Sequence, residues 1–341
     1  MDRCVDCGHE EISYNSCRNR HCPKCQCLAQ ARWLAQRKAR ILPVPHFHVV
    51  FTLPARLSPV ARRNPRLLYG LLFEAASRTL LELGRDPKWL GGLMGLTAVL
   101  HTWARDLSYH PHVHCVVTAG ALSPDGERWL PSSSRYLFPV QVLSRLYRGK
   151  FMDGLKRAWS CGELNLGCDD PEVFARLRDA LFGVEWVVYA KRPFGGAEQV
   201  YAYLGRYTHR VGISNHRQLH VDEREVRIAT RDGKTATMEP LELIRRVLQH
   251  VLPPSFVKIR HYGLLASACV SGKLERARSA IAAPTERAEP LPADWRALMV
   301  RLTGRDLGRC PACDHGRMHT PVARRSPPAR GPPEPSRPYQ P

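Results

Sequence analysis

The chain has 341 residues, of which 44% are apolar, and its 51 Lys and Arg against 31 Asp and Glu give a formal net charge of +20. This composition supports a sizeable core, and the positive charge predicts a polyanionic partner such as nucleic acid. The chain contains no run of about 18 apolar residues and no signal-peptide pattern, which excludes a transmembrane helix and predicts a cytoplasmic protein without a membrane partner. In that reducing compartment the 12 cysteines are expected to be metal ligands and buried thiols.

The first 30 residues are rich in soft metal ligands. Two Cys-x2-Cys pairs, Cys4/Cys7 and Cys22/Cys25, are separated by fourteen residues, a spacing typical of a tetrahedral structural Zn2+ site. Cys17 and His21 are further candidates, because they could replace one pair or help to form a second site. The basic residues inside this segment are candidate DNA contacts, although solvated charges on a small zinc loop would look the same; they are Arg18, Arg20 and Lys24.

Hydrophobic periodicity predicts an irregular alternation of helices and strands down to residue 191. The predicted helices span 29–41, 67–80 and 142–159, and the predicted strands span 46–53, 91–103, 112–119, 129–138 and 186–191. Hairpin-like links between them favour an α+β fold, with an antiparallel sheet covered on one face by helices. No Gly-rich phosphate loop follows a strand, so we expect no nucleoside triphosphate partner.

The strand predicted at 112–119 carries His112 and His114 two residues apart. A period of two places both imidazoles on one face, where they suit a divalent cation. His110 has the same parity, but Pro111 interrupts the run and marks the start of the strand. Histidine pairs are common on surface strands, so this motif alone is a weak signal for metal binding.

A helix predicted at 197–209 aligns Gln199, Tyr203 and Tyr207 at intervals of four residues. Arg206 and Arg210 follow each tyrosine by three residues and point roughly the same way. A phenol has a pKa of about 10 and needs a nearby cation or base to act as a nucleophile at neutral pH. Tyrosines at this spacing also serve as ordinary packing residues.

The remainder of the chain gives weaker signals. We predict a hairpin within 211–230 and helices at 241–251, 274–282 and 295–302. A candidate second zinc site consists of Cys310, Cys313, His315 and His319. The sequence gives equal support for and against zinc binding at this site. From Thr320 onward, eight prolines in 22 residues predict a disordered tail.

The His-x-His strand followed by the Tyr-x3-Tyr helix resembles the HUH endonucleases. The runs 13–26, 42–54, 99–103 and 260–263 are, in addition, similar to the two-tyrosine rolling-circle transposases of bacterial insertion sequences. The resemblance implies an antiparallel sheet with the metal-binding histidines on a central strand, and a catalytic Mg2+ or Mn2+ held by His112, His114 and, as our choice of third ligand, Gln199. It also implies that Tyr203 or Tyr207 attacks a single-stranded DNA end to form a 5'-phosphotyrosine.

Four segments follow from these motifs. We expect a zinc-binding domain with a basic helix at 1–42, an HUH nuclease domain at 43–262, a helical region at 263–319 and a disordered tail at 320–341. In the resembled family a further helical segment precedes the zinc ligands, so we expect either an N-terminally truncated copy or a start codon assigned too late. Three alternatives stay open: an HUH replication initiator or relaxase, a non-catalytic zinc-dependent DNA-binding remnant, and, less favoured, a zinc hydrolase, for which no general-base carboxylate is evident. The oligomeric state is not predicted.

Overall fold

The computed structural model describes residues 1–12, 27–38, 40–133, 135–194, 199, 217–230, 233–282, 291–304, 306–313 and 315–319. The chain forms two compact units. The terminal unit combines residues 1–17 with 291–341, and the sheet unit comprises residues 18–290. This division differs from the predicted segments, because the end of the predicted C-terminal region joins the beginning of the chain.

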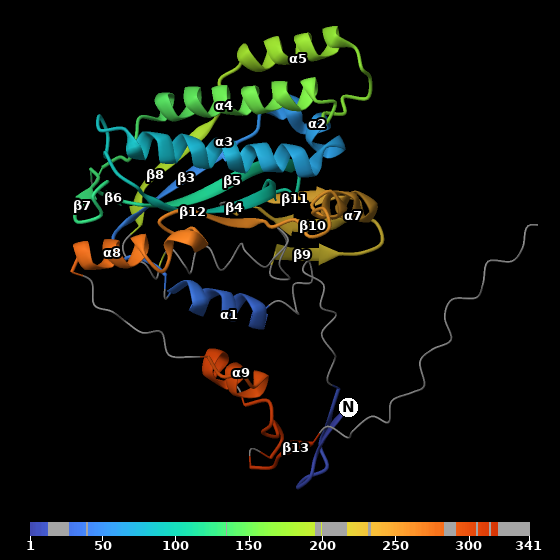
Figure 1. Cartoon of the computed structure of the whole chain (residues 1–341). Coiled ribbons are helices and arrows are strands. Elements are labelled where there is room, and N and C mark those ends of the chain that lie inside the picture. The colour runs from blue at the N-terminus through green and yellow to red at the C-terminus, as the bar shows by residue number, and fades with distance from the viewer. Residues whose placement is uncertain are drawn as a thin grey trace, which may run out of the picture. The chain divides into compact units, whose positions relative to one another are not determined.

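The sheet unit is built on a five-stranded antiparallel sheet in the order β12-β4-β5-β3-β8 (Figure 1). Its strands are β3 (His46–Thr52), β4 (Gly95–Trp103), β5 (Tyr109–Thr118), β8 (Val188–Phe194) and β12 (Ile259–Gly263). The predicted α+β class with an antiparallel sheet is therefore confirmed. The predicted strand 91–103 begins only at Gly95, and β5 begins before His112 and includes Pro111.

Two long helices cover the apolar face of this sheet, α3 (Pro65–Arg85) and α4 (Val140–Ser160). The face presents Phe47, Val49 and Phe51 from β3, with Val113 and Cys115 from β5, all at most 1% exposed. In α4 the buried side chains recur every three or four residues, as an amphipathic helix requires; they are Leu143, Tyr147, Phe151, Leu155 and Ala158. These residues form the main core of the protein.

The opposite face of the sheet is partly covered by the short helix α1 (Cys27–Lys38). Trp33 and Leu34 of α1 pack against Val99 of β4 and Val116 of β5. Figure 1 shows α1 on the side of the sheet away from α3 and α4. A sheet with one apolar and one more polar face is typical of antiparallel architecture, and it leaves the second face available for a site.

Smaller elements surround the sheet. They are the 3-10 helices η1 (Ala55–Leu57) and η3 (Ser267–Cys269), the helices α2 (Ser58–Arg63), α5 (Pro171–Phe182), α7 (Pro240–Leu248) and α8 (Lys273–Ala280), and the strands β6 (Gly120–Leu122), β7 (Trp129–Pro131), β9 (Gln218–Val221), β10 (Val226–Ala229) and β11 (Thr235–Met238). Several of these elements differ from the predictions. Helix α2 and strand β6 were not predicted, and the strand predicted at 129–138 ends at Pro131. Helix α5 was not predicted, although Asp170 caps it by accepting a hydrogen bond from the Glu172 N–H. The hairpin predicted within 211–230 gains β11 as a third strand.

The terminal unit contains β1 (Asp2–Cys4), β2 (Glu10–Glu11), α9 (Trp295–Thr303) and β13 (Met318–His319). These strands form a small antiparallel sheet in the order β13-β1-β2, in which Arg3 pairs with His319 and Cys4 with Met318. The first and last described strands of the chain are therefore hydrogen-bonded neighbours.

The predicted tyrosine helix, 197–209, lies outside the described residues except for Gln199, and the predicted tail lies wholly outside them. Among the helices that the structure describes, none combines the length and the apolar character needed to cross a membrane.

Candidate functional site

The histidines of β5 lie on the face of the sheet opposite the main core. In the sheet register His112 is paired with Thr52 of β3 and His101 of β4, and His114 with Val50 and Val99. Their neighbours Val113 and Cys115 point into the core. The predicted alternation along this strand is therefore what the structure shows, and it aims both imidazoles at the same side.

A third imidazole joins them from the neighbouring strand. His101 lies directly across from His112, and one ring nitrogen from each of His101, His112 and His114 falls within 4.8 Å of the others. The ring centroid of His101 is 4.2 Å from that of His114 and 5.4 Å from that of His112. We name this group the histidine centre. Sequence reasoning did not assign His101, although its parity on β4 was a usable signal.

Hydrogen bonds orient two of these rings. His112 Nδ1 lies 2.6 Å from the backbone oxygen of His110, so Nδ1 carries the proton and donates it. The lone pair of the neutral ring then resides on Nε2, the form in which histidine binds a metal. His114 Nδ1 lies 2.7 Å from Nε2 of His48, which comes from β3. A hydrogen bond to the second ring nitrogen is the usual way in which a metal-binding histidine is held in place.

Burial keeps the cluster neutral. The pKa of His112 is lowered to about 4, chiefly by burial, and burial also lowers the pKa of His101 and His114 well below the ordinary value. For His48, burial and then the charge of Lys191 lower the pKa to about 4. Near neutral pH these rings therefore offer lone pairs.

Three neutral imidazoles in one place form a donor set that fits a divalent metal ion. Imidazole nitrogen suits Zn2+, Cu2+, Fe2+ and Ni2+, whereas Mg2+ prefers oxygen ligands and retains water. The imidazoles are therefore poor ligands for Mg2+, which leaves a preference for Mn2+ or another transition metal open. No described carboxylate takes part in this ligand group.

Cationic side chains surround the same face. The charge of Lys258 acts on His101, and that of Lys191 on His48. Arg37 and Arg40, at the end of α1 and just beyond it, act on His261 of β12, whose pKa burial and these charges lower to about 4. Cationic side chains beside the histidine centre attract anions, and phosphate oxygens are among the groups that Lys and Arg bind.

The other site residues predicted for the sheet unit are not part of the histidine centre as it is defined above. Gln199, the expected third metal ligand, is exposed. Tyr203, Tyr207, Arg206 and Arg210 lie outside the described residues, as do Arg18, Arg20 and Lys24. Their predicted roles remain predictions.

A second ligand cluster lies in the terminal unit. The sulfurs of Cys4, Cys7, Cys310 and Cys313 fall within 4.8 Å of one another. Four thiolates in this arrangement suit Zn2+. Cys4 and Cys7 were predicted as one half of a site, but Cys310 and Cys313 were predicted separately with His315 and His319, which are not in the cluster. Cys17, His21, Cys22 and Cys25 lie outside the described residues.

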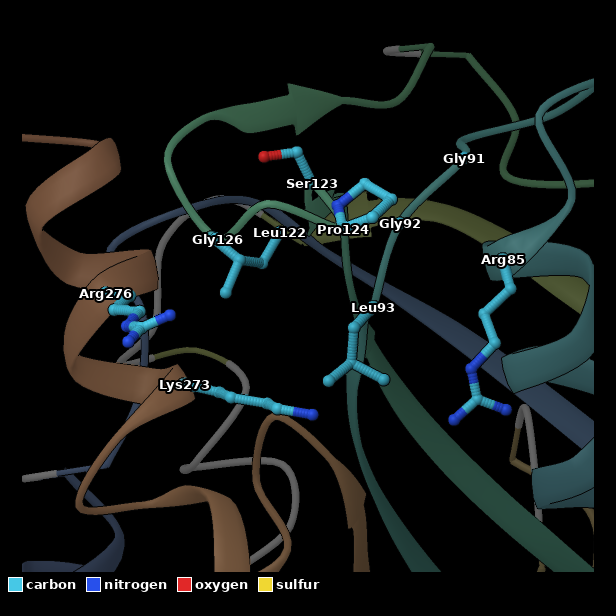
Figure 2. A pocket seen from close by; sticks show the side chains of 10 residues that line it. All are labelled: Arg85, Gly91, Gly92, Leu93, Leu122, Ser123, Pro124, Gly126, Lys273 and Arg276. Atoms are coloured by element: carbon cyan, nitrogen blue, oxygen red, sulfur yellow. The ribbon is translucent and has the colours of Figure 1, made fainter.

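A pocket of about 350 Å³ opens at the other end of the sheet, between the start of β4, the turn after β6 and helix α8. Figure 2 shows Lys273 extending from α8 toward Leu93, with Arg276 on the same helix and Arg85 on the far side. From Gly95 to His101 the strand covers about 20 Å. The pocket therefore belongs to a different region from the histidine centre.

Comparison with known proteins shows which family this chain resembles. A family model described as "Putative transposase" matches residues 95–272, and a second, described as "Transposase zinc-binding domain", matches residues 1–53. The chain belongs to this transposase family. It is 44% identical to "Putative transposase y4qJ" of Sinorhizobium fredii, over 94% of this chain and 84% of that protein. It is 28% identical to "Transposase for insertion sequence element IS801" of Pseudomonas savastanoi pv. phaseolicola, over 92% and 77% of the respective chains.

The family assignment explains two features of this transposase. The first matched segment contains both histidine strands, β4 and β5, and the edge strand β12. The second contains Cys4 and Cys7 and supports Zn2+ as the metal that these two cysteines bind. A protein that acts on DNA also accounts for the net charge of +20.

Proposed function

We propose that this transposase nicks and rejoins single-stranded DNA at the ends of an insertion sequence, in a metal-dependent reaction through a 5'-phosphotyrosine. The observation that carries the proposal is the convergence of His101, His112 and His114 on one face of the sheet. We assign the third metal ligand to His101 in place of Gln199, since an imidazole that already lies within the ligand group needs no rearrangement.

The chain's own groups account for most of the chemistry. His101, His112 and His114 hold the ion, the His110 carbonyl and His48 orient two of the rings, and the lysines near the face draw the strand toward it. Mg2+ or Mn2+, when bound, polarises the scissile phosphate and offsets the charge that develops during attack.

The nucleophile in this proposal is Tyr203 or Tyr207. The phenolic oxygen attacks phosphorus and forms the new P–O bond, while the bond from phosphorus to the 3'-oxygen breaks. The phenol loses its proton to water, and the leaving 3'-oxygen gains one. The phosphodiester energy is conserved in the phosphotyrosine, so a second strand's 3'-hydroxyl can reverse the step without hydrolysis. Two tyrosines allow two such exchanges in succession, which is the requirement of rolling-circle transposition.

Single-stranded DNA is the expected substrate because an extended strand can place one phosphate against a recessed ligand group. The pocket cations Arg85, Lys273 and Arg276 provide a second positive region that suits more distant phosphates of the same DNA. DNA of this kind is found in the bacterial cytoplasm, where we expect the transposase to act.

A nicking assay tests the proposal. Purified transposase is incubated with a single-stranded oligonucleotide that carries the element's end, with Mn2+ or Mg2+, and the products are separated on a denaturing gel. We expect a covalent protein–DNA adduct that the Tyr203→Phe/Tyr207→Phe double variant and His112→Ala do not form. His110→Ala is the matched control on the same strand, because the hydrogen bond that orients His112 goes to the His110 backbone oxygen, which alanine retains.

The competing hypothesis, a zinc-dependent DNA-binding remnant, predicts binding without any adduct under every metal condition. If the wild type retards the oligonucleotide in a native gel but forms no adduct with either ion, the nicking proposal is wrong and the remnant hypothesis is favoured.

A further inference from the structure

We propose that a single zinc ion closes the terminal unit by joining Cys4 and Cys7 at the start of the chain to Cys310 and Cys313 near its end. The zinc-binding family model covers only residues 1–53. In this proposal half of the ligands therefore come from a segment more than 250 residues beyond that domain. The inference concerns the terminal unit alone and is independent of the nicking reaction.

The separations between sulfurs fit tetrahedral coordination. Cys4 Sγ lies 3.8 Å from Cys313 Sγ, and Cys7 Sγ lies 3.6 Å from Cys310 Sγ. A Zn–S bond of about 2.3 Å places the sulfurs of a regular tetrahedron about 3.8 Å apart. All four cysteines are free thiols in the structure, so each sulfur is available as a thiolate ligand.

In each cysteine loop a backbone N–H donates to the sulfur of the first cysteine. In the first, the Cys7 N–H donates to Cys4 Sγ at 3.5 Å, and in the second the Ala312 N–H donates to Cys310 Sγ at 3.4 Å. Backbone donors that point at a sulfur favour its thiolate form, which is the form that binds zinc.

Backbone pairing holds the loops face to face. Cys4 pairs with Met318 across the β1–β13 ladder, and the N–H of Cys310 donates to the oxygen of Gly316 at 2.8 Å. A Cβ on Gly316 would lie 2.5 Å from Cys4 Sγ and 2.8 Å from Cys313 Sγ, so only glycine leaves room for the sulfurs. The bend at Gly316, which leads into β13, therefore lies close against the sulfurs of both pairs.

Zinc content tests the proposal directly. Purified full-length chain, the Cys4→Ser/Cys7→Ser variant, the Cys310→Ser/Cys313→Ser variant and the quadruple variant are compared by elemental mass spectrometry. We expect each double variant to lose one zinc per chain, and the quadruple variant to lose no more than either. Two losses in the quadruple variant would mean two separate sites and would overturn the proposal, as would full zinc retention after Cys310→Ser/Cys313→Ser.

Two control variants accompany these measurements. Cys161→Ser/Cys168→Ser changes two exposed cysteines of the sheet unit and is expected to keep the full zinc content. His315→Ala/His319→Ala is also expected to keep it, because neither histidine is in the cluster. Zinc loss in the histidine variant would favour a separate C-terminal site instead.

A second measurement uses the unaltered chain and so avoids misfolded variants. Thiol alkylation is followed residue by residue by peptide mass spectrometry, before and after addition of a zinc chelator. We expect Cys4, Cys7, Cys310 and Cys313 to react slowly at first and to become reactive together when the chelator removes zinc. If Cys310 and Cys313 are alkylated as fast as Cys161 before the chelator is added, they do not bind the metal.

Discussion

The histidine centre takes its three ligands from β4 and β5, adjacent strands of one sheet, whereas the cysteine cluster takes two ligands from each end of the chain. His101 and His112 are paired across a single ladder, only eleven residues apart in the sequence. Cys4 and Cys313 are 309 residues apart. The first centre thus depends on strand register and the second on long-range closure of the chain.

This contrast has an energetic side. Bringing two distant segments together costs conformational entropy, and this cost grows slowly with the length of the loop between them. The free energy of metal binding offsets much of this cost, because the metal joins the two segments. The histidine strands are already aligned by the sheet and the core beneath it. We therefore expect metal removal to destabilise the terminal unit and to leave the sheet unit folded but inactive.

The largest expected effect lies in the histidine centre. His101→Ala should lower metal-dependent nicking by about 100-fold or more, because one of three imidazole ligands is lost. Gln199→Ala should change it by about threefold at most, since Gln199 is exposed and His101 takes the place of the third ligand in our proposal. Initial rates across a Mn2+ titration measure both variants. The reverse order of effects would restore Gln199 as the third ligand.

The next effect concerns the cysteine cluster. Gly316→Ala retains all four thiolates but pushes a methyl group against two of them. We expect zinc affinity to fall by about tenfold or more, because the sulfurs can no longer keep tetrahedral spacing. Competition with a chelator of known affinity measures the change. Gly149→Ala is the control, since nothing lies within 4 Å of an added Cβ there; equal zinc retention by the two variants would contradict the assigned geometry.

A smaller effect is expected at the residue that orients His114. His48→Ala should weaken Mn2+ binding by about tenfold, the lower end of what the loss of such a partner costs. Activity should recover at saturating Mn2+, because the three ligands remain. His48→Gln should keep part of the affinity, since its side-chain oxygen can accept the His114 Nδ1 proton. A loss that persists at saturating Mn2+ would mean that His48 is itself a ligand.

The smallest effect is on the pH dependence of stability. His261 has a folded pKa of about 4, lowered chiefly by burial, whereas an unfolded histidine titrates near 6.5. Between these values the unfolded chain binds the additional proton, so stability falls as the pH is lowered from about 6.5 through about 4. His261→Gln should reduce this loss by about 1 kcal/mol after allowance for solvent screening. Thermal unfolding from pH 7.5 to pH 4 measures it; parallel curves for wild type and variant would refute the assignment.

Local patterns in the sequence were sufficient for much of the sheet unit. Alternation predicted β3 and the His112/His114 face, and a helical stripe predicted α4 to within two residues at its start. Helix α5 was missed, although its boundary signals, the Asp170 cap and Pro171, stand in the sequence. The β11 strand was missed because four residues after a turn carry too little periodicity to be recognised alone.

The sequence by itself determined which residue types can bind metal and which face of β5 carries them, because side-chain alternation is a local property of a strand. Only the tertiary structure decided which of these residues meet. His101 enters the histidine centre through the β4–β5 register, and Cys310 and Cys313 reach Cys4 and Cys7 through the β13–β1 pairing. Neither partnership is encoded in spacing along the chain, since strand order and closure of the chain ends are set by packing of the whole fold.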